Sequence, residues 1–288
     1  WQFYSPGGKC IPFGNYKESE SKGDAGRVSV VHDKSSLLRC LLEDSENHGV
    51  DVFPGSNVIG IVKDGTTISI KTAGGKTFSG RFVIAADGTN SVIAKKLRFN
   101  AKRDFYATLM GYGWDILGSE MEEPFSLKTW IGEDKPTSFF FSIPRAYSDE
   151  YAIIGGGFNP QIDHESQMEN FLTRGKFSSW FKNIEKVRKL AFCENVYAPI
   201  YEPYRDNTLL IGDAAWSIEA EITGSIMCGW KAANAVTLAL KDNKPTREGV
   251  ETYLAWWKDS FLKYDYKGYL RSLAMLYVLD AEDVRYVY

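Results

Sequence analysis

Two short segments of this chain place glycine and aspartate at the end of an apolar run. The first, residues 85–91 (Ala-Ala-Asp-Gly-Thr-Asn-Ser), continues the run 81–86. Ligands of open α/β sheets bind beyond the carboxyl ends of the strands, where this segment is expected to lie. Gly88 allows close approach of a ligand to the backbone, and Asp87 can accept hydrogen bonds from a ribose or from backbone N–H groups. Ser91 is expected to cap the next helix, although Asp-Gly after a strand is also a common plain turn.

The second segment, residues 211–215 (Ile-Gly-Asp-Ala-Ala), has the same arrangement. A Thr-Gly-Ser stretch at residues 223–225 is then predicted to open a long helix that reaches Lys241. Asp213 is placed to bind the ribityl chain of a flavin, and the positive end of the helix would stabilise an anionic reduced flavin. Each segment alone fits an ordinary strand-to-helix turn. Both together, about 125 residues apart, favour a cofactor site.

The spacing of apolar residues predicts the elements that position these segments. A strand at 28–31, a helix after Asp33 and a strand at 50–53 form the first expected unit. Alternation over residues 56–83, with Asp-Gly and Gly-Gly turns, predicts a three-stranded meander. The nearly continuous apolar run 81–86 predicts a parallel strand buried on both faces.

Longer alternating runs between residues 99 and 210 predict an antiparallel sheet. Two helices, at 167–174 and around 177–184, are expected to interrupt it. The fold class is therefore α/β, a Rossmann-like sheet interleaved with an antiparallel β-sheet and followed by a helical C-terminus. The expected domains are residues 1–98 and 206–245 for the cofactor, 99–205 for the substrate and 246–288 for the helical segment.

Composition narrows the class of protein. The 288 residues are 44% hydrophobic and carry a net charge of −3, which gives no indication of nucleic-acid binding. Four scattered cysteines without a C-x-x-C pair argue against a metal site and favour reduced thiols in the cytoplasm. No apolar run approaches the ~18 residues of a membrane span. The aromatic content of 14% suits an apolar cavity or ordinary core packing.

On these residues the chain resembles the FAD-dependent oxidoreductases of the para-hydroxybenzoate hydroxylase fold, in particular the geranylgeranyl reductase-like group. The stretch 30–53, the Asp-Gly-x-x-Ser segment and the Gly-Asp-Ala-Ala segment with its Thr-Gly carry the resemblance. It implies non-covalent FAD, with a basic residue near the phosphates and the two segments around ribityl and ring. The cofactor-binding residues so implied are Lys34, Asp87, Gly88, Ser91, Gly212, Asp213, Ala214, Thr223, Gly224 and Ser225.

A further stretch bears on the substrate. Residues 139–144 (Phe-Phe-Phe-Ser-Ile-Pro), with glycines at 155–157, are similar to the stretch that lines the isoprenoid cavity in these reductases. The resemblance implies a substrate wall, and alternation puts its first three members on one face. The wall would consist of Phe139, Phe141, Ile143 and Pro144, with Trp216 beside the flavin ring or in the core. An edge strand ending in proline would explain the same residues.

The activity that the resemblance implies is reduction or dehydrogenation of a hydrophobic, isoprenoid substrate by hydride transfer through the flavin N5. Reduced nicotinamide or a donor protein would supply the electrons, and a peripheral membrane contact would suit the substrate. Glu219 and Glu221, in a loop expected to face the ring, are candidate catalytic proton donors or a solvated acidic turn. A monooxygenase or halogenase is the alternative, against which Trp216 argues, because flavin hydroxylases usually have histidine there.

The glycine-rich G-x-G-x-x-G that holds the ADP half of FAD follows no strand in this sequence. We therefore expect that segment to come from elsewhere, either from a longer protein or from a separate partner chain. The strands predicted at 28–31 and 81–86 would otherwise lack sheet neighbours. The isolated chain is accordingly expected to be poorly soluble or to bind FAD weakly.

Overall fold

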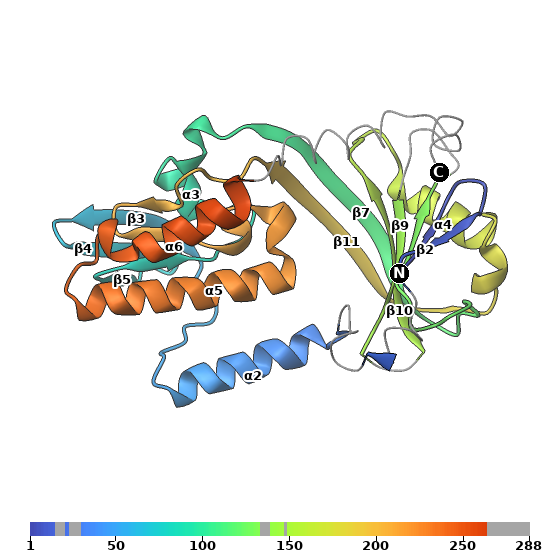
Figure 1. Ribbon diagram of the computed structural model, residues 1–288, viewed down its shortest axis with the longest axis horizontal. Helices are drawn as coiled ribbons and strands as arrows, with labels where there is room; N and C mark the ends of the chain where they lie inside the picture. The colour runs from blue at the N-terminus through green and yellow to red at the C-terminus, as the bar shows by residue number, and fades with distance from the viewer. Residues whose placement is uncertain (15–20, 23–29, 133–138, 147–148, 264–288) are drawn as a thin grey trace. The chain divides into compact units, whose positions relative to one another are not determined.

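A computed structural model of the chain describes residues 1–14, 21–22, 30–132, 139–146 and 149–263 (Figure 1). The described residues belong to two compact units, each built from separate stretches of the chain. Of the described residues, the first unit contains Trp1–Val52 and Thr108–Cys193, and the second contains Phe53–Ala107 and residues 194–263.

The first unit contains a seven-stranded sheet in the order β11-β7-β10-β9-β8-β1-β2. Neighbours from β7 to β8 run antiparallel, as predicted, whereas β1 lies parallel to β8 and forms an antiparallel hairpin with β2. The strands are β1 (Gln2–Tyr4), β2 (Cys10–Pro12), β7 (Phe105–Leu117), β8 (Lys128–Ile131), β9 (Phe139–Pro144), β10 (Glu150–Gly157) and β11 (Glu185–Tyr197).

One face of this sheet packs against helix α4. Helix α4 (His164–Thr173) begins at the N-cap Asp163 and buries Met168 and Leu172. These two side chains join a cluster of large aromatic residues on the α4 face, among them Trp130 and Phe140. Because side chains alternate along a strand, the neighbours of Phe140 on β9 point to the opposite face.

An ion-pair network connects the edge strand β11 to its neighbour β7. Asp115 of β7 is fully buried and accepts hydrogen bonds from Arg145 at 2.6 and 2.8 Å. Its second oxygen lies 2.5 Å from the Arg188 Nη2 atom of β11. Leaving this carboxylate without either partner would place an uncompensated charge in the interior, so the network fixes β11 against β7.

The second unit contains two small sheets. Strands β3 (Val58–Asp64), β4 (Thr67–Thr72) and β5 (Thr77–Gly80) form the predicted antiparallel meander. Strands β6 (Val83–Ala85), β13 (Thr208–Leu210) and β12 (Tyr204–Arg205) form the other sheet, in which β6 and β13 are parallel. β6 has no second strand neighbour among the described residues.

Helices complete the second unit. The long helix α5 (Ser217–Lys241) and α6 (Glu251–Trp257) pack with β6 and β13 in one apolar core. Trp257 is 1% exposed, and its indole N–H donates to the carbonyl of Ile200 at 2.8 Å. A 3₁₀ turn (Glu248–Val250) and a π-helical turn (Lys258–Leu262) flank α6. The helical prediction for residues 246–288 thus agrees up to residue 262, and residues 264–288 lie outside the described part.

Three predictions of secondary structure are wrong. Residues 30–31 and 50–53 form no strand, and residues 28–29 lie outside the described part. Only the helix between them forms, as α2 (Lys34–Asn47), and it has no buried residue. A strand needs a partner for its N–H and C=O groups, and no described strand offers one here. The helix expected at 177–184 is a single 3₁₀ turn, Ser178–Phe181, before β11.

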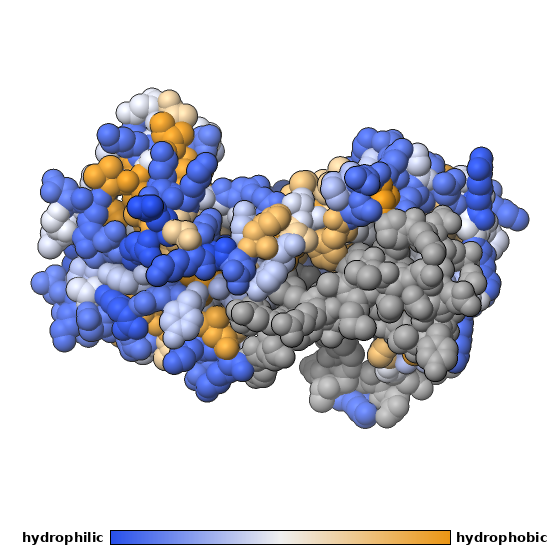
Figure 2. Space-filling view, turned by 90° about the horizontal axis from the view of Figure 1, so that it is seen from above, coloured by the Kyte–Doolittle hydropathy of each residue, from blue (hydrophilic) through white to orange (hydrophobic). Residues whose placement is uncertain are grey.

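The surface is mixed in character. On the face drawn in Figure 2, hydrophilic residues predominate and apolar residues form small separate patches. Within the described residues, no helix combines the length and the apolar character that crossing a bilayer would need.

Candidate functional site

The two glycine-aspartate segments follow neighbouring parallel strands of the second unit. Leu210 of β13 is paired with Ala85 of β6, and the next residue, Ile211, donates its N–H to the Ala85 carbonyl at 3.0 Å. The chain then turns at Gly212 in one strand and at Gly88 in the other. The structure therefore brings both segments to the same edge of the sheet.

The first turn is organised by Asp87. Its carboxylate accepts hydrogen bonds from the Ser91 hydroxyl at 2.6 Å and from the Ile93 N–H at 3.2 Å. Ser91 in turn accepts from the Ala94 N–H at 2.8 Å and caps the short helix α3 (Val92–Lys96), as predicted. Gly88 has a φ of +78°, and a Cβ added there would meet nothing within 4 Å. The turn thus exposes both its backbone and the Asp87 carboxylate.

The second turn packs against helix α5. Gly212 has a φ of +56°, and an added Cβ would lie 3.2 Å from the Ser225 hydroxyl. Gly212–Ala214 form one 3₁₀ turn, in which Ala214 is buried and Asp213 is partly exposed. A glycine is therefore required at the point where this loop meets the helix.

Cys228, one turn beyond Ser225 on α5, is 1% exposed. Burial raises the pKa of its thiol. A neutral, enclosed thiol fits the interpretation of Cys228 as a small core residue.

Arg103 is a site residue that sequence reasoning missed. Its guanidinium donates to the carbonyl of Ala215 at 2.7 Å and also to the carbonyl of Ala198. It lies over the Tyr197 ring, 5.0 Å from the centroid, and burial lowers the pKa of Arg103 to about 10. Arg103 thereby holds the loop that follows Asp213. No motif marks this arginine, which stands in an irregular stretch before β7.

Helix α5 begins earlier than predicted. The helix begins at Ser217, so Thr223, Gly224 and Ser225 lie inside it and not at its N-terminus. Glu219 and Glu221 belong to the same helix and not to a loop. Residues 217–222 contain no helix breaker, so the helix extends through them. The catalytic role of the two glutamates stays a prediction.

The remaining predicted residues are distributed over both units. Lys34 is the first residue of α2 in the first unit, directly after the N-cap Asp33. Pro144 is buried and, by alternation, points to the α4 face, away from the other members of the predicted substrate wall. Trp216 belongs to the core of the second unit, with its ring 5.9 Å from that of Phe261 in an edge-on contact.

The turn geometry fits a dinucleotide cofactor. Two positive-φ glycines lie at adjacent parallel strand ends, Gly88 leaves open space for a ligand at the backbone, and an aspartate adjoins each glycine. A comparison with family models agrees with this: residues 20–218 match the FAD binding domain. The chain belongs to the FAD-binding domain family. Its cofactor is FAD.

Curated relatives of this family member include digeranylgeranylglycerophospholipid reductases. The chain is 22% identical over 256 residues to the digeranylgeranylglycerophospholipid reductase of Methanococcus vannielii, covering 84% of the chain and 64% of the relative. It is 24% identical over 225 residues to the enzyme of the same name from Methanocaldococcus jannaschii, covering 75% and 57%. The chain thus spans about three fifths of the length of these relatives.

Solved structures share the fold. A geranylgeranyl bacteriochlorophyll reductase-like protein from Thermoplasma acidophilum matches with a TM-score of 0.72 at 15% identity, over 98% of this chain and 72% of that one. The halogenase PltM in complex with FAD matches with a TM-score of 0.62 at 14% identity, over 78% and 50%. At such identities these matches establish the fold, an α/β flavoprotein fold with an antiparallel sheet.

Proposed function

We propose that this protein is an FAD-dependent reductase that acts on a carbon–carbon double bond of an isoprenoid lipid. The observation that carries the proposal is one apolar sheet face in the first unit. Phe139, Phe141 and Ile143 of β9 share it, and Phe141 and Ile143 are partly exposed. The names of the curated relatives support the same substrate class.

Glycines of the neighbouring strands adjoin this face, and the Phe192 ring of β11 packs over Gly111 and extends its apolar surface. Phe141 is paired with Ile154 of β10, and Phe139 is paired with Gly156. On the other side of β10, Ile154 is paired with Gly113 of β7, and Gly156 is paired with Gly111. Cross-strand partners share a face, so large apolar side chains on β9 adjoin positions without side chains. Such a surface suits a flexible hydrocarbon chain, which binds through apolar contact without a polar anchor.

The residues of the second unit fit FAD, and bound FAD supplies the hydride chemistry that a reduction requires. Asp87 and Asp213 would hold its polar chain at the two strand ends. Arg103 keeps the second loop in place through the Ala215 carbonyl. The other predicted contributors are Gly88, Ser91, Gly212, Ala214, Thr223, Gly224 and Ser225 around the cofactor, Lys34 near its phosphates, and Glu219 or Glu221 as proton donor.

A test uses anaerobic reoxidation of the flavin. The FAD-loaded protein is reduced with dithionite, a digeranylgeranyl lipid is added without oxygen, and the flavin absorbance is followed. We expect the oxidised spectrum to return and mass spectrometry to find a lipid heavier by two hydrogens per double bond reduced. Reoxidation that requires oxygen would contradict the proposal.

A monooxygenase or halogenase is the second candidate. It is supported by the fold shared with PltM and with the Klebsiella pneumoniae protein HpxO, whose complex contains FAD and uric acid and matches at 17% identity with a TM-score of 0.53. Trp216 argues against it, because it stands where flavin hydroxylases usually have histidine. Oxygen uptake coupled to oxidation of a reduced nicotinamide would favour this candidate.

We also infer that a glycine-rich βαβ segment pairs with the open edge of β6 and completes the FAD site. Ile84 on that strand is 41% exposed. An exposed apolar side chain on a parallel strand with one open edge favours addition of another strand. The segment would come from a longer protein or from a partner chain, and expression together with the part of a curated relative that this chain does not match should raise the affinity for FAD.

A further inference from the structure

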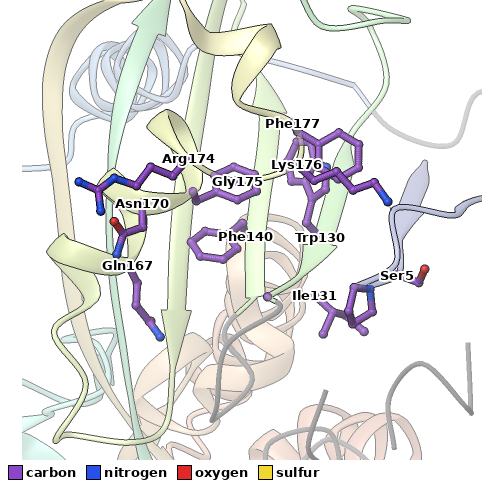
Figure 3. Close-up of a pocket in the computed structure, with 13 residues that line it drawn as sticks. Ser5, Trp130, Ile131, Phe140, Gln167, Asn170, Arg174, Gly175, Lys176 and Phe177 are labelled. Atoms are coloured by element: carbon purple, nitrogen blue, oxygen red, sulfur yellow. The ribbon is translucent and has the colours of Figure 1, made fainter. Parts of the chain in front are cut away.

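A cavity of about 350 Å³ lies on the α4 face of the seven-stranded sheet (Figure 3). It is lined by side chains from α4, β8 and β9, and by the turn after β1 and the segment after α4. Phe140 lines this cavity, whereas its neighbour Phe141 belongs to the opposite face. The cavity is therefore separate from the apolar wall of the proposed substrate site. Its volume lies within the range of small-molecule sites, roughly 300–1,000 Å³.

The wall of the cavity is aromatic. Phe140 and Phe171 stack with ring centroids 4.2 Å apart, and Trp130 meets Phe171 edge-on at 5.3 Å. Phe177 lies 6.0 Å from Trp130. These contacts hold the rings in place, so the apolar part of the cavity is formed before a ligand arrives.

One polar group in this wall has no partner. Trp130 is 2% exposed, and its buried indole N–H makes no hydrogen bond. Buried donors are nearly always paired, because an unpaired one loses its hydrogen bond to water without compensation. The nitrogen atom has less than 1 Å² of accessible surface, so the cavity is lined by the ring of Trp130 and not by its N–H.

The charged residues at the cavity have one sign. Arg174 and Lys176 line it, and none of the described lining residues is acidic. In the view of Figure 3 the two cations lie on either side of the Phe140 ring. Lys176 already donates to the Gly7 carbonyl, whereas the Arg174 guanidinium makes no hydrogen bond or ion pair with a described residue. Arg174 is thus the available partner for an anion.

We propose that this cavity binds an organic anion, with its carboxylate or phosphate group at Arg174 and its apolar body against the aromatic wall. Two sources share this chemistry, an aromatic acid and a fatty acid. The ligand accepts hydrogen bonds from the Arg174 guanidinium, and its apolar body packs on the Trp130 and Phe140 rings. This site stands independently of the FAD site and of the proposed reaction.

Isothermal titration of the full FAD-loaded chain tests the site with four probes: naphthoate, decanoate, neutral naphthalene methanol and inorganic phosphate. Naphthoate or decanoate should bind at one site. The tighter of the two shows whether the ligand is an aromatic acid or a fatty acid. The neutral alcohol and phosphate should bind at least about tenfold more weakly, because each lacks one half of the recognised chemistry.

Two variants and a control locate the binding. Arg174→Gln should weaken the better anion about tenfold, and Trp130→Ala should weaken it several-fold, because the largest ring of the wall is lost. Lys182→Gln removes the same charge from an exposed residue that does not line the cavity, and should leave the affinity unchanged. The proposal is overturned if neither anion binds at millimolar concentration. It is also overturned if all three variants bind like the parent protein, or if the neutral alcohol binds as tightly as naphthoate. Flavin absorbance of each sample separates these outcomes from a failure of the FAD site.

Discussion

The backbone N–H of Ile211 donates to the carbonyl oxygen of Ala85 at 3.0 Å. This bond is the last one between β13 and β6 before the chain turns at Gly212 and at Gly88. It brings together two loops that lie about 125 residues apart in the sequence. The position of Asp213 relative to Asp87 therefore depends on the pairing of two three-residue strands.

Loss of the Arg103 guanidinium should loosen the second of these loops. In Arg103→Met the buried carbonyls of Ala198 and Ala215 lose a charged donor, so the free energy of unfolding should fall by about 2–3 kcal/mol. FAD affinity should fall with it. Urea denaturation and FAD titration measure both, with exposed Arg81→Met as the control. Equal stability of the two variants would show that Arg103 does not support the loop.

Neighbouring phenylalanines on β9 should respond differently to truncation. Phe140 is 5% exposed and packs in the aromatic cluster, so Phe140→Ala should cost about 3–5 kcal/mol of stability. Phe141 is partly exposed on the other face, so Phe141→Ala should change the melting temperature less and raise the KM for the lipid while FAD stays bound. If Phe141→Ala unfolds the protein or leaves lipid turnover unchanged, this face is not the substrate wall.

Lys128 gives the stability a pH dependence. The side chain is fully buried, and burial lowers its pKa to about 8 from the usual 10.5. Between these values the unfolded chain holds a proton that the folded chain has lost. The free energy of unfolding should therefore rise with pH, by up to about 1.4 kcal/mol per unit from this group.

The comparison of parent protein and Lys128→Met between pH 7.5 and 9.5 isolates that contribution. Urea denaturation should give a more positive slope against pH for the parent. Superimposable slopes would mean that Lys128 is charged and solvated in the folded protein.

Exposed apolar residues of the second unit should promote self-association of the isolated chain. Trp230 and Leu238 on α5 are 59% and 55% exposed. Replacing both by glutamine should increase the monomer fraction in sedimentation velocity, because less apolar surface meets water. Phe125→Gln, at an 82% exposed residue of the first unit, serves as the control. A parent chain that is already a monodisperse monomer with tight FAD binding would contradict the need for a further segment.

Local patterns in the sequence predicted some elements well. The meander β3–β5 followed from alternation and from Asp-Gly and Gly-Gly turns, and Gly65 and Gly75 adopt the positive φ that such turns need. The two glycine-aspartate segments were found for a similar reason, since their residue types are tied to local backbone geometry.

Elements that depend on distant contacts were missed. Strand β11 contains Lys186, Arg188 and Lys189, which obscure any apolar alternation at its start, and such charged residues are common on edge strands. Its place is fixed by Asp115, about 70 residues earlier, and no local pattern reports that ion pair. Arg103 was missed for the same reason, because its partners Ala198 and Ala215 are backbone carbonyls more than 90 residues away.

FAD retention by Asp213→Ala tests the central claim most directly. Parent protein, Asp213→Ala and the control Asp64→Ala, which changes an exposed hairpin carboxylate, are loaded with FAD and passed through gel filtration. The flavin that remains is measured by absorbance after acid precipitation, which releases a non-covalent cofactor. We expect the parent and Asp64→Ala to carry equal flavin, and Asp213→Ala to have lost most of it while its circular dichroism spectrum is unchanged. Full flavin content in a folded Asp213→Ala protein would contradict the assignment of this strand end to the FAD site.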